Sequence, residues 1–252
     1  MSREGLYPRK YGQVILKNVK VAVGEVRELG LAPGSHVLEI GPGPGTLTRY
    51  LLEKGYKVTA VESDHRFVEE LKILFTDEIR SGNLVIIKDD IMEFKSGYFD
   101  GIIGNVPYHI SSEIVFRLSD FDFKRAILMF QKEFAERLTA KVGTKSYSRL
   151  TVNAQLRYNA KIVGRVSRNS FFPVPRVDSA IVSIELKKEF PNEKIQAADT
   201  IFQKLFSARR KKISSTFRNV SPEYADKRPG DLSPLELYNL ALTVLPYPVS
   251  DP

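Results

Sequence analysis

The chain has 252 residues, 42% of them hydrophobic, which allows one α/β domain with a small additional unit and excludes a disordered protein. Lysine and arginine number 38 against 30 acidic residues, and the resulting charge of +8 suits either a polyanionic partner such as RNA or simply a basic, solvated surface. The absence of cysteine excludes disulfides, thiolate zinc sites and cysteine nucleophiles. No apolar run approaches the ~18 residues of a membrane span, and the three histidines are far apart. We therefore expect no metal, no membrane contact and a cytoplasmic protein.

Apolar periodicity predicts strands that alternate with helices from about residue 18 to residue 130. In chain order we expect a helix over 18–29, a strand over 36–40, a helix from about 46, a strand over 57–61, a helix over 66–75, strands over 84–88 and 101–104, a helix over 112–117, a strand over 126–130 and a helix over 132–140. This alternation is typical of an α/β fold with a Rossmann-like, mainly parallel sheet and helices on both faces.

The carboxyl-terminal part has a different pattern. Residues 150–166 predict one long strand or a strand after a short helix, and 179–186 predict another strand. A proline-rich link over 172–175 must be extended. Residues 191–193 resemble a linker, and short helices should follow. We place a domain boundary near residue 188, which gives a main domain over 1–188 and a small helical domain over 189–252.

A glycine loop follows the first predicted strand of the sheet. Gly41, Gly43 and Gly45 let the backbone turn tightly and approach a ligand closely. A dinucleotide-binding loop is the alternative, but the spacing here is G-x-G-x-G, preceded by Glu39, and not G-x-G-x-x-G. The pattern favours S-adenosylmethionine as cofactor over NAD.

Two acids follow the next two predicted strands. Glu62 ends the strand over 57–61, where its carboxylate can accept both ribose hydroxyls. Asp90 follows the strand over 84–88 and is placed to accept from an adenine amino group. Each acid alone is typical of a solvated turn, but such a turn does not account for their order behind successive strands.

The stretch Asn105-Val106-Pro107-Tyr108 follows the apolar run of the fourth predicted strand. An open α/β sheet binds its ligands at that edge, although the string alone is also an ordinary turn. The Asn105 side-chain oxygen and the Val106 carbonyl can accept from an exocyclic amine, and Pro107 fixes the chain. Tyr108 can stack on an extruded base. Phe171 or Phe172 can lie on the other side of that base, although a phenylalanine before prolines is more often a core residue.

At this point the chain resembles the KsgA-type small-subunit rRNA adenine N6,N6-dimethyltransferases and, less closely, the Erm enzymes. The resemblance covers almost the whole chain, and its motifs are specific through their order and spacing. They are Tyr11-Gly12-Gln13 with Leu16, the run from Glu39 to Thr48, Glu62-Ser63-Asp64, Asp90, Asn105-Val106-Pro107-Tyr108, Gln131-Lys132-Glu133, Tyr147-Ser148-Arg149-Leu150, the run from Phe171 to Ser179 and Phe206-Ser207-Ala208-Arg209-Arg210-Lys211.

The resemblance implies specific roles. It assigns Gln13, Asn105, the glycine loop, Glu62 and Asp90 to the cofactor, as its methionine, ribose and adenine contacts. It assigns Asn105, Pro107, Tyr108 and Phe171 to the target base. It also implies an rRNA-binding carboxyl domain, a monomer, and a substrate of two adjacent adenines in a hairpin near the 3′ end of the small-subunit rRNA within a partly assembled subunit. Val14 departs from the pattern, which usually has Asn or His there.

Three alternatives remain open. An Erm-like enzyme would act on large-subunit rRNA, although Asp178 favours the small-subunit type. A non-catalytic assembly factor would keep the fold and bind RNA, but it would have no need of the Asn105–Tyr108 motif. A DNA adenine methyltransferase is the third.

Overall fold

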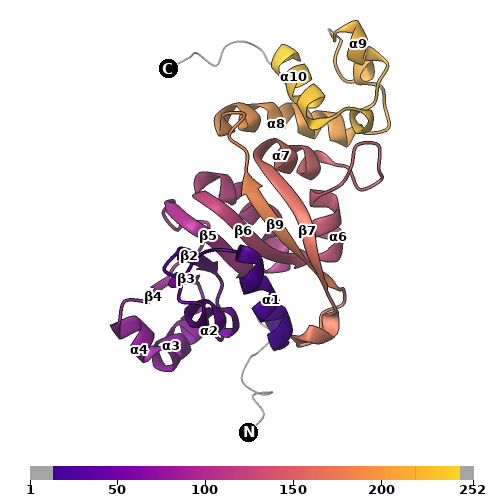
Figure 1. The fold of residues 1–252 in the computed structure, drawn as a ribbon. Coiled ribbons are helices and arrows are strands. Elements are labelled where there is room, and N and C mark those ends of the chain that lie inside the picture. Colours follow the sequence, from indigo (N-terminus) through magenta and orange to yellow (C-terminus); the bar gives the residue numbers. More distant parts are fainter. Residues whose placement is uncertain (1–13, 219, 245–252) are drawn as a thin grey trace. The chain divides into compact units, whose positions relative to one another are not determined.

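The computed structural model describes residues 14–218 and 220–244, which contain a seven-stranded sheet (Figure 1). The strands are β2 (His36–Ile40), β3 (Lys57–Glu62), β4 (Leu84–Lys88), β5 (Tyr98–Asn105), β6 (Asp122–Gln131), β7 (Tyr158–Val166) and β9 (Ser179–Leu186). Their order is β4-β3-β2-β5-β6-β9-β7. β4, β3, β2, β5 and β6 pair in parallel, and β9 runs antiparallel to β6. The predicted mainly parallel α/β sheet is confirmed.

By internal contacts the chain divides into two compact units. The first unit contains Met1–Lys132 and Ile162–Ile184, and the second contains Glu133–Lys161 and Glu185–Pro252. Each unit is built from two chain segments, so the contact division is not a single cut near residue 188. Whether 189–252 acts as a separate functional domain stays a prediction.

The first unit flanks the sheet with helices. These are α1 (Val19–Leu29), α2 (Thr46–Glu53), α3 (His65–Leu74), α4 (Thr76–Arg80) and α5 (Ser111–Arg117), with the 3-10 turns η1 (Tyr108–Ile110), η2 (Leu118–Asp120) and η3 (Arg168–Ser170). α1 packs against β5 and β6, α2 against β3, and α3 against β3 and β4. A separate antiparallel pair joins β1 (Ile15–Leu16) to β8 (Phe171–Phe172).

α1 shows how local sequence sets a helix. The Asn18 side chain accepts a hydrogen bond from the backbone amide of Lys20 at the amino end. Gly30 ends the helix in the left-handed conformation, with a φ of 61°. Ala22, Val26 and Leu29 form its buried stripe. Helix α1 therefore presents a defined face to β5 and β6.

The second unit has its own apolar core, formed mainly by α7 (Arg149–Arg157), α8 (Asn192–Ser207) and α10 (Pro234–Val244). Shorter elements complete it: α6 (Lys132–Leu138), α9 (Pro222–Ala225), η4 (Ile213–Ser215) and η5 (Pro229–Asp231). Asp199 accepts hydrogen bonds from the Arg149 guanidinium (Nε, 2.7 Å) and the Asn153 amide (2.7 Å). The Tyr147 hydroxyl donates to the Leu232 carbonyl at 2.9 Å. The Tyr147–Leu150 motif thus stabilises this unit.

The chain order of the sheet creates a switch point. From β2 the chain proceeds outward to β3 and β4, and then returns to place β5 on the other side of β2. At the carboxyl ends of these strands, Ile40 of β2 is paired with Gly104 of β5. Loops that leave neighbouring strands in opposite directions open a crevice there, which is where open α/β sheets bind ligands. Within residues 14–218 and 220–244, no helix is long and apolar enough to cross a membrane.

Candidate active site

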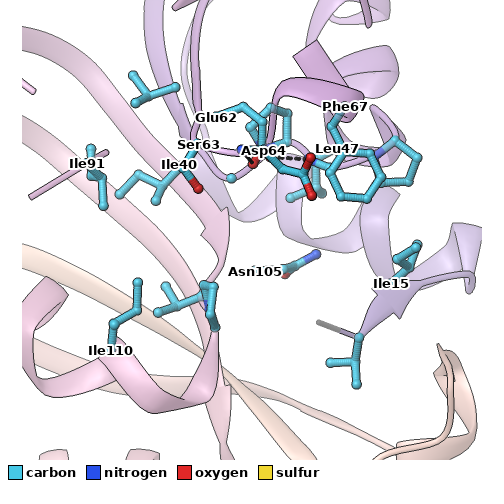
Figure 2. Close-up of a pocket in the computed structure, with 18 of the residues that line it drawn as sticks. Ile15, Ile40, Leu47, Glu62, Ser63, Asp64, Phe67, Ile91, Asn105 and Ile110 are labelled. Carbon is cyan, nitrogen blue, oxygen red and sulfur yellow. Dashed lines mark hydrogen bonds between the residues drawn. The ribbon is translucent and has the colours of Figure 1, made fainter. Parts of the chain in front are cut away.

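A cavity of about 830 Å³ lies at this switch point, within the first unit (Figure 2). This volume lies in the range of ~300–1,000 Å³ typical of small-molecule sites. Loops that follow β2, β3, β4 and β5 line it, together with β1 and β8. Its lining includes the predicted site residues Gly41, Gly43, Glu62, Asp90, Asn105, Pro107, Tyr108 and Phe171. Residues from separate parts of the sequence are therefore brought to one cavity.

The glycine loop lines the cavity on the side of β2. Gly41 and Gly43 have φ values of 63° and 53°, and a Cβ atom added to either would meet nothing within 4 Å. A ligand can therefore approach this backbone closely. Gly45 is different, because a Cβ atom there would lie 2.9 Å from Leu71 Cδ2 and 2.6 Å from Phe75 Cε2. Gly45 lets α2 begin against α3, and it does not line the cavity.

Glu62 holds the glycine loop and the start of α3 together. Its Oε2 accepts from the Gly43 amide at 3.0 Å, and its Oε1 accepts from the Asp64 amide at 2.9 Å. Figure 2 shows hydrogen bonding at the Glu62–Asp64 turn as dashes. Burial raises the pKa of Glu62 and these two hydrogen bonds lower it, with a net upward shift. Asp64 pairs with Arg66 through Oδ2 and Nη2 at 2.6 Å, and this contact lowers the pKa of Asp64.

Asp90 lies at the far side of the cavity, directly after β4. Its Oδ1 accepts from the Met92 amide at 2.9 Å, which fixes the carboxylate in its turn. The side chain is exposed, with apolar Ile91 and Met92 beside it in the cavity wall. This position permits the predicted contact to an adenine amino group.

The Asn105–Tyr108 segment lines the cavity on the β5 side. Figure 2 shows the Asn105 side chain facing the Glu62–Asp64 turn, with Ile15 on one side and Ile110 on the other. Its amide is half-buried, and its Oδ1 is fully enclosed without a hydrogen-bond partner among the described residues. The Tyr108 hydroxyl lies 2.8 Å from the Ser179 hydroxyl of β9. Burial raises the pKa of Tyr108, although the Ser179 contact lowers it in part. Tyr108 is therefore a neutral phenol with a tethered hydroxyl group.

Phe171 also lines the cavity, where β8 pairs its backbone with Leu16 of β1. Its side chain is only 2% exposed and belongs to the main apolar core. The stacking role that the resemblance implies for Phe171 stays a prediction. Gln13, the remaining predicted cofactor residue, lies outside the described residues. Val14, which departs from the family pattern, does line the cavity.

Sequence reasoning missed the buried acid Glu25, the full burial of Glu39 and the role of the Ser179 hydroxyl. Ser179 was not predicted to hold Tyr108. Glu39 is fully buried before the glycine loop, where its Oε2 accepts from the Thr48 hydroxyl at 2.7 Å. Burial raises the pKa of Glu39 to about 8. Glu25 is also fully buried, on the stripe of α1 that carries Ala22 and Val26. An acid on the apolar stripe of a predicted helix is the signal that would have revealed Glu25.

The cavity fits S-adenosylmethionine in three respects. Gly41 and Gly43 leave an open backbone cradle, as a ligand that lies against the loop requires. The carboxylates of Glu62 and Asp90 stand after successive strands, where hydroxyl and amino groups can donate to them. Carboxylates also suit a ligand that carries a sulfonium and an ammonium group. The glycine backbone and the two carboxylates thus match the cofactor predicted from the sequence.

Comparison with protein families identifies the chain. The model of ribosomal RNA adenine dimethylases matches residues 7–230. The chain belongs to this family. As a ribosomal RNA adenine dimethylase it is an S-adenosylmethionine-dependent methyltransferase, so the cofactor and reaction class predicted from the sequence are confirmed.

Named relatives of the dimethylase agree. "Ribosomal RNA small subunit methyltransferase A" of Malacoplasma penetrans is 41% identical over 216 residues, which are 85% of this chain and 79% of that protein. "Dimethyladenosine transferase" of Candida glabrata is 40% identical over 212 residues, 83% of this chain and 67% of that protein.

Solved structures of two transferases are also similar to this chain. A dimethyladenosine transferase from Plasmodium falciparum superposes with a TM-score of 0.80 at 30% identity, covering 91% of this chain and 96% of that one. The 23S rRNA methyltransferase ErmE has a TM-score of 0.69 at 25% identity, covering 90% and 99%. By both measures the Erm alternative is the more distant of the two.

Proposed function

We propose that this dimethylase transfers methyl groups from S-adenosylmethionine to N6 of two adjacent adenines in a hairpin near the 3′ end of small-subunit rRNA. The product is N6,N6-dimethyladenine, formed during ribosome biogenesis. One observation carries the proposal: the Asn105–Tyr108 segment and the open glycines Gly41 and Gly43 line the same cavity, at the ends of paired strands. The names of the relatives support the small subunit as the source of the RNA.

On the donor side, the proposal assigns one contact to each loop. The backbone at Gly41 and Gly43 holds the methionine part, Glu62 accepts from the ribose hydroxyls, and Asp90 accepts from the adenine amino group. Each Glu62 oxygen already accepts one backbone hydrogen bond and keeps a second lone pair for a hydroxyl group. When bound, the cofactor supplies an electrophilic methyl group on a sulfonium.

On the acceptor side, Asn105 and the Val106 carbonyl raise the reactivity of the target amine. The amine is a poor nucleophile because its lone pair is delocalised into the adenine ring. Acceptors aimed at both of its hydrogens favour a pyramidal nitrogen with a freer lone pair. As the new carbon–nitrogen bond forms and the carbon–sulfur bond breaks, the proton lost from nitrogen passes to water. Tyr108 stacks on the extruded base, which holds the nitrogen in line with the methyl group.

The substrate is a partly assembled small subunit rather than free RNA. Base-reading groups are few in this cavity, and hairpin RNA is read mostly through its shape and phosphates. The chain carries a net charge of +8, so phosphates spread over a large RNA surface would contribute much of the affinity. We also propose that the enzyme acts as a monomer in the cytoplasm, where such subunits would be available.

The test is methyl transfer to purified small subunits that lack the modification, with the modified nucleotides mapped. The same assay at equal RNA concentration and salt uses the isolated hairpin and naked large-subunit rRNA. We expect dimethylation of two adjacent adenines, with much more incorporation into small subunits than into either comparison RNA. Preference for large-subunit rRNA would favour the Erm-like alternative. Equal activity on the hairpin would contradict subunit recognition, and cofactor binding without any transfer would favour a non-catalytic factor.

A further inference from the structure

Glu25 is an acidic residue in the apolar interior, where burying a carboxyl group is destabilising. It is 0% exposed and lies on the face of α1 that packs against the sheet. Burial raises the pKa of Glu25 well above its ordinary value, the Asn105 side chain lowers it in part, and Glu39 raises it further. Among the described residues, neither Glu25 oxygen has a well-aligned hydrogen-bond partner. Leaving a polar group unpaired at this depth is destabilising, so a partner within reach would be used.

The Asn105 side chain is that partner. It lies close enough to Glu25 to influence its carboxyl group, and it has an unpaired, enclosed atom of its own, Oδ1. A side-chain amide has nearly the same shape when its oxygen and nitrogen exchange places. With Nδ2 on the enclosed side, the amide donates to a Glu25 oxygen, and Oδ1 takes the position toward the cavity. This orientation gives one Glu25 oxygen a donor and removes Asn105 Oδ1 from the enclosed side.

The chemistry requires this same orientation. A target amine presents two hydrogens, so it needs an acceptor from Asn105, and Nδ2 in that place would present hydrogens to hydrogens. An Asn105 amide surrounded only by apolar groups could take either orientation. A carboxylate behind it removes that freedom, because it can only accept, and an N–H donor favours the carboxylate, in line with the lowering of the Glu25 pKa by the Asn105 side chain. Glu25 does not line the cavity, so it cannot reach the substrate itself.

We propose that Glu25 is a positioning residue for methyl transfer: it accepts a hydrogen bond from Asn105 Nδ2 and thereby holds Asn105 Oδ1 toward the target amine. The proposal rests on the proposed role of Asn105 in the acceptor site. It does not make Glu25 a base or a cofactor ligand.

The experiment compares Glu25→Met with Glu25→Gln. Methionine has a similar length but no acceptor, whereas glutamine keeps an acceptor oxygen. Single-turnover methyl transfer to unmodified small subunits gives the rate constant, and calorimetry gives the S-adenosylmethionine affinity. We expect Glu25→Met to slow transfer by about tenfold or more, with the cofactor affinity unchanged within about twofold. Glu25→Gln should recover most of the rate. Glu28→Met, on the same helix but only partly buried, is the control and should behave like the wild type.

Two further variants separate this proposal from the proposed function. Asn105→Ala should be nearly inactive, and adding Glu25→Met to it should cause no further loss, because both changes act through one amide. An active Asn105→Ala would refute the proposed function of Asn105. An inactive Asn105→Ala beside a fully active Glu25→Met would overturn only the positioning role. Equal losses in Glu25→Met and Glu25→Gln, together with lower melting temperatures, would also overturn it and leave Glu25 a packing residue.

Discussion

The backbone amide of Gly43 donates a 3.0 Å hydrogen bond to Oε2 of Glu62, so the acid that ends β3 supports the glycine loop that follows β2. Glu62→Ala should remove both this support and the proposed ribose contact. We expect cofactor binding to weaken by roughly 1–3 kcal/mol in calorimetry. Glu69→Ala, on the exposed surface of α3, is the control.

The two contributions of Glu62 can be separated with a cofactor analogue that lacks the ribose hydroxyls. If Glu62 contacts the ribose, the analogue should bind the wild type more weakly than S-adenosylmethionine does, and Glu62→Ala should discriminate less between the two ligands. Equal discrimination by both proteins would leave Glu62 with loop support alone. Wild-type affinity of Glu62→Ala would remove the residue from the site.

Asp90 should contribute to cofactor binding through the adenine amino group. Its Oδ1 is already fixed by the Met92 amide, so the carboxylate is preorganised at the cavity wall. Asp90→Ala should weaken binding by roughly 1–3 kcal/mol, because a donor of the buried adenine loses its acceptor. Calorimetry measures the change, with Asp77→Ala on α4 as the control. An unchanged dissociation constant would exclude Asp90 from the cofactor contacts.

Tyr108 should act through its ring rather than its hydroxyl group. The hydroxyl is tethered to Ser179 at 2.8 Å, and burial raises the pKa of Tyr108, so the phenol does not ionise near neutral pH. Tyr108→Phe should keep most of the activity, whereas Tyr108→Ala should lose roughly 1–3 kcal/mol of base stacking. Steady-state kcat and KM on small subunits distinguish the two variants. Equal impairment of both would show that the hydroxyl group matters, and Ser179→Ala should then reproduce the loss.

The sequence located the sheet well because buried strands have a simple signature. The predicted strands over 36–40, 84–88 and 179–186 coincide with β2, β4 and β9. β5 and β6 begin earlier than predicted, at Tyr98 and Asp122, because pairing with neighbours extends strands into charged residues that an apolar pattern omits. Of the two interpretations of 150–166, the short helix followed by a strand is confirmed as α7 and β7. The predicted linker over 191–193 is wrong, since α8 begins at Asn192 directly after Pro191.

Within the site, the sequence located the loops but not the depth of each residue. The three glycines were assigned together to the cofactor, yet tertiary packing gives Gly45 a separate role against Leu71 and Phe75. Spacing along one strand cannot reveal which helix will pack behind it. For this reason the proximity of Glu25 to Asn105 could be recognised only once α1 was placed against β5 and β6.

In the basic cluster Arg209–Lys212, two side chains form hydrogen bonds or ion pairs with other described residues of the protein and two do not. Arg209 donates to the carbonyls of Lys145 and Thr144, both at 2.7 Å, and Lys212 pairs with Asp226 at 2.7 Å. Arg210, Lys211 and Lys212 are all exposed, but within residues 14–218 and 220–244 no hydrogen bond or ion pair engages the side chain of Arg210 or Lys211. Contacts of this cluster with rRNA phosphates should therefore depend mainly on Arg210 and Lys211.

Changing Arg210 and Lys211 together to Gln should weaken binding to small subunits. The slope of log affinity against log salt should fall by about 1.4–1.8, as expected for two lost phosphate contacts. Filter binding over a series of salt concentrations measures this slope. Lys54→Gln with Lys57→Gln removes the same charge near the amino end of β3, away from the cavity, and should leave the slope nearly unchanged. Equal slopes for wild type and the Arg210/Lys211 variant would make the cluster an ordinary solvated surface.

Glu39 should make the protein less stable as the pH rises. Burial raises its pKa to about 8, the Thr48 hydroxyl lowers it in part, and the Glu62 carboxylate raises it further. The folded protein therefore keeps this proton between about pH 4.3 and pH 8, whereas the unfolded chain loses it. The stabilising contribution is complete below the unfolded pKa and is lost progressively up to about pH 8, with a slope of at most ~1.4 kcal/mol per pH unit.

Glu39→Gln removes the titration but keeps an acceptor for Thr48. The free energy of unfolding of the variant minus that of the wild type should therefore increase steadily from pH 5.5 to pH 7.5. Glu25 and Glu62 also titrate with raised pKa values, but they are present in both proteins, so most of their contribution cancels in the difference. Urea unfolding at several pH values measures it, with the exposed Glu53→Gln as control. A difference that does not change with pH would mean that Glu39 is already ionised in the folded protein.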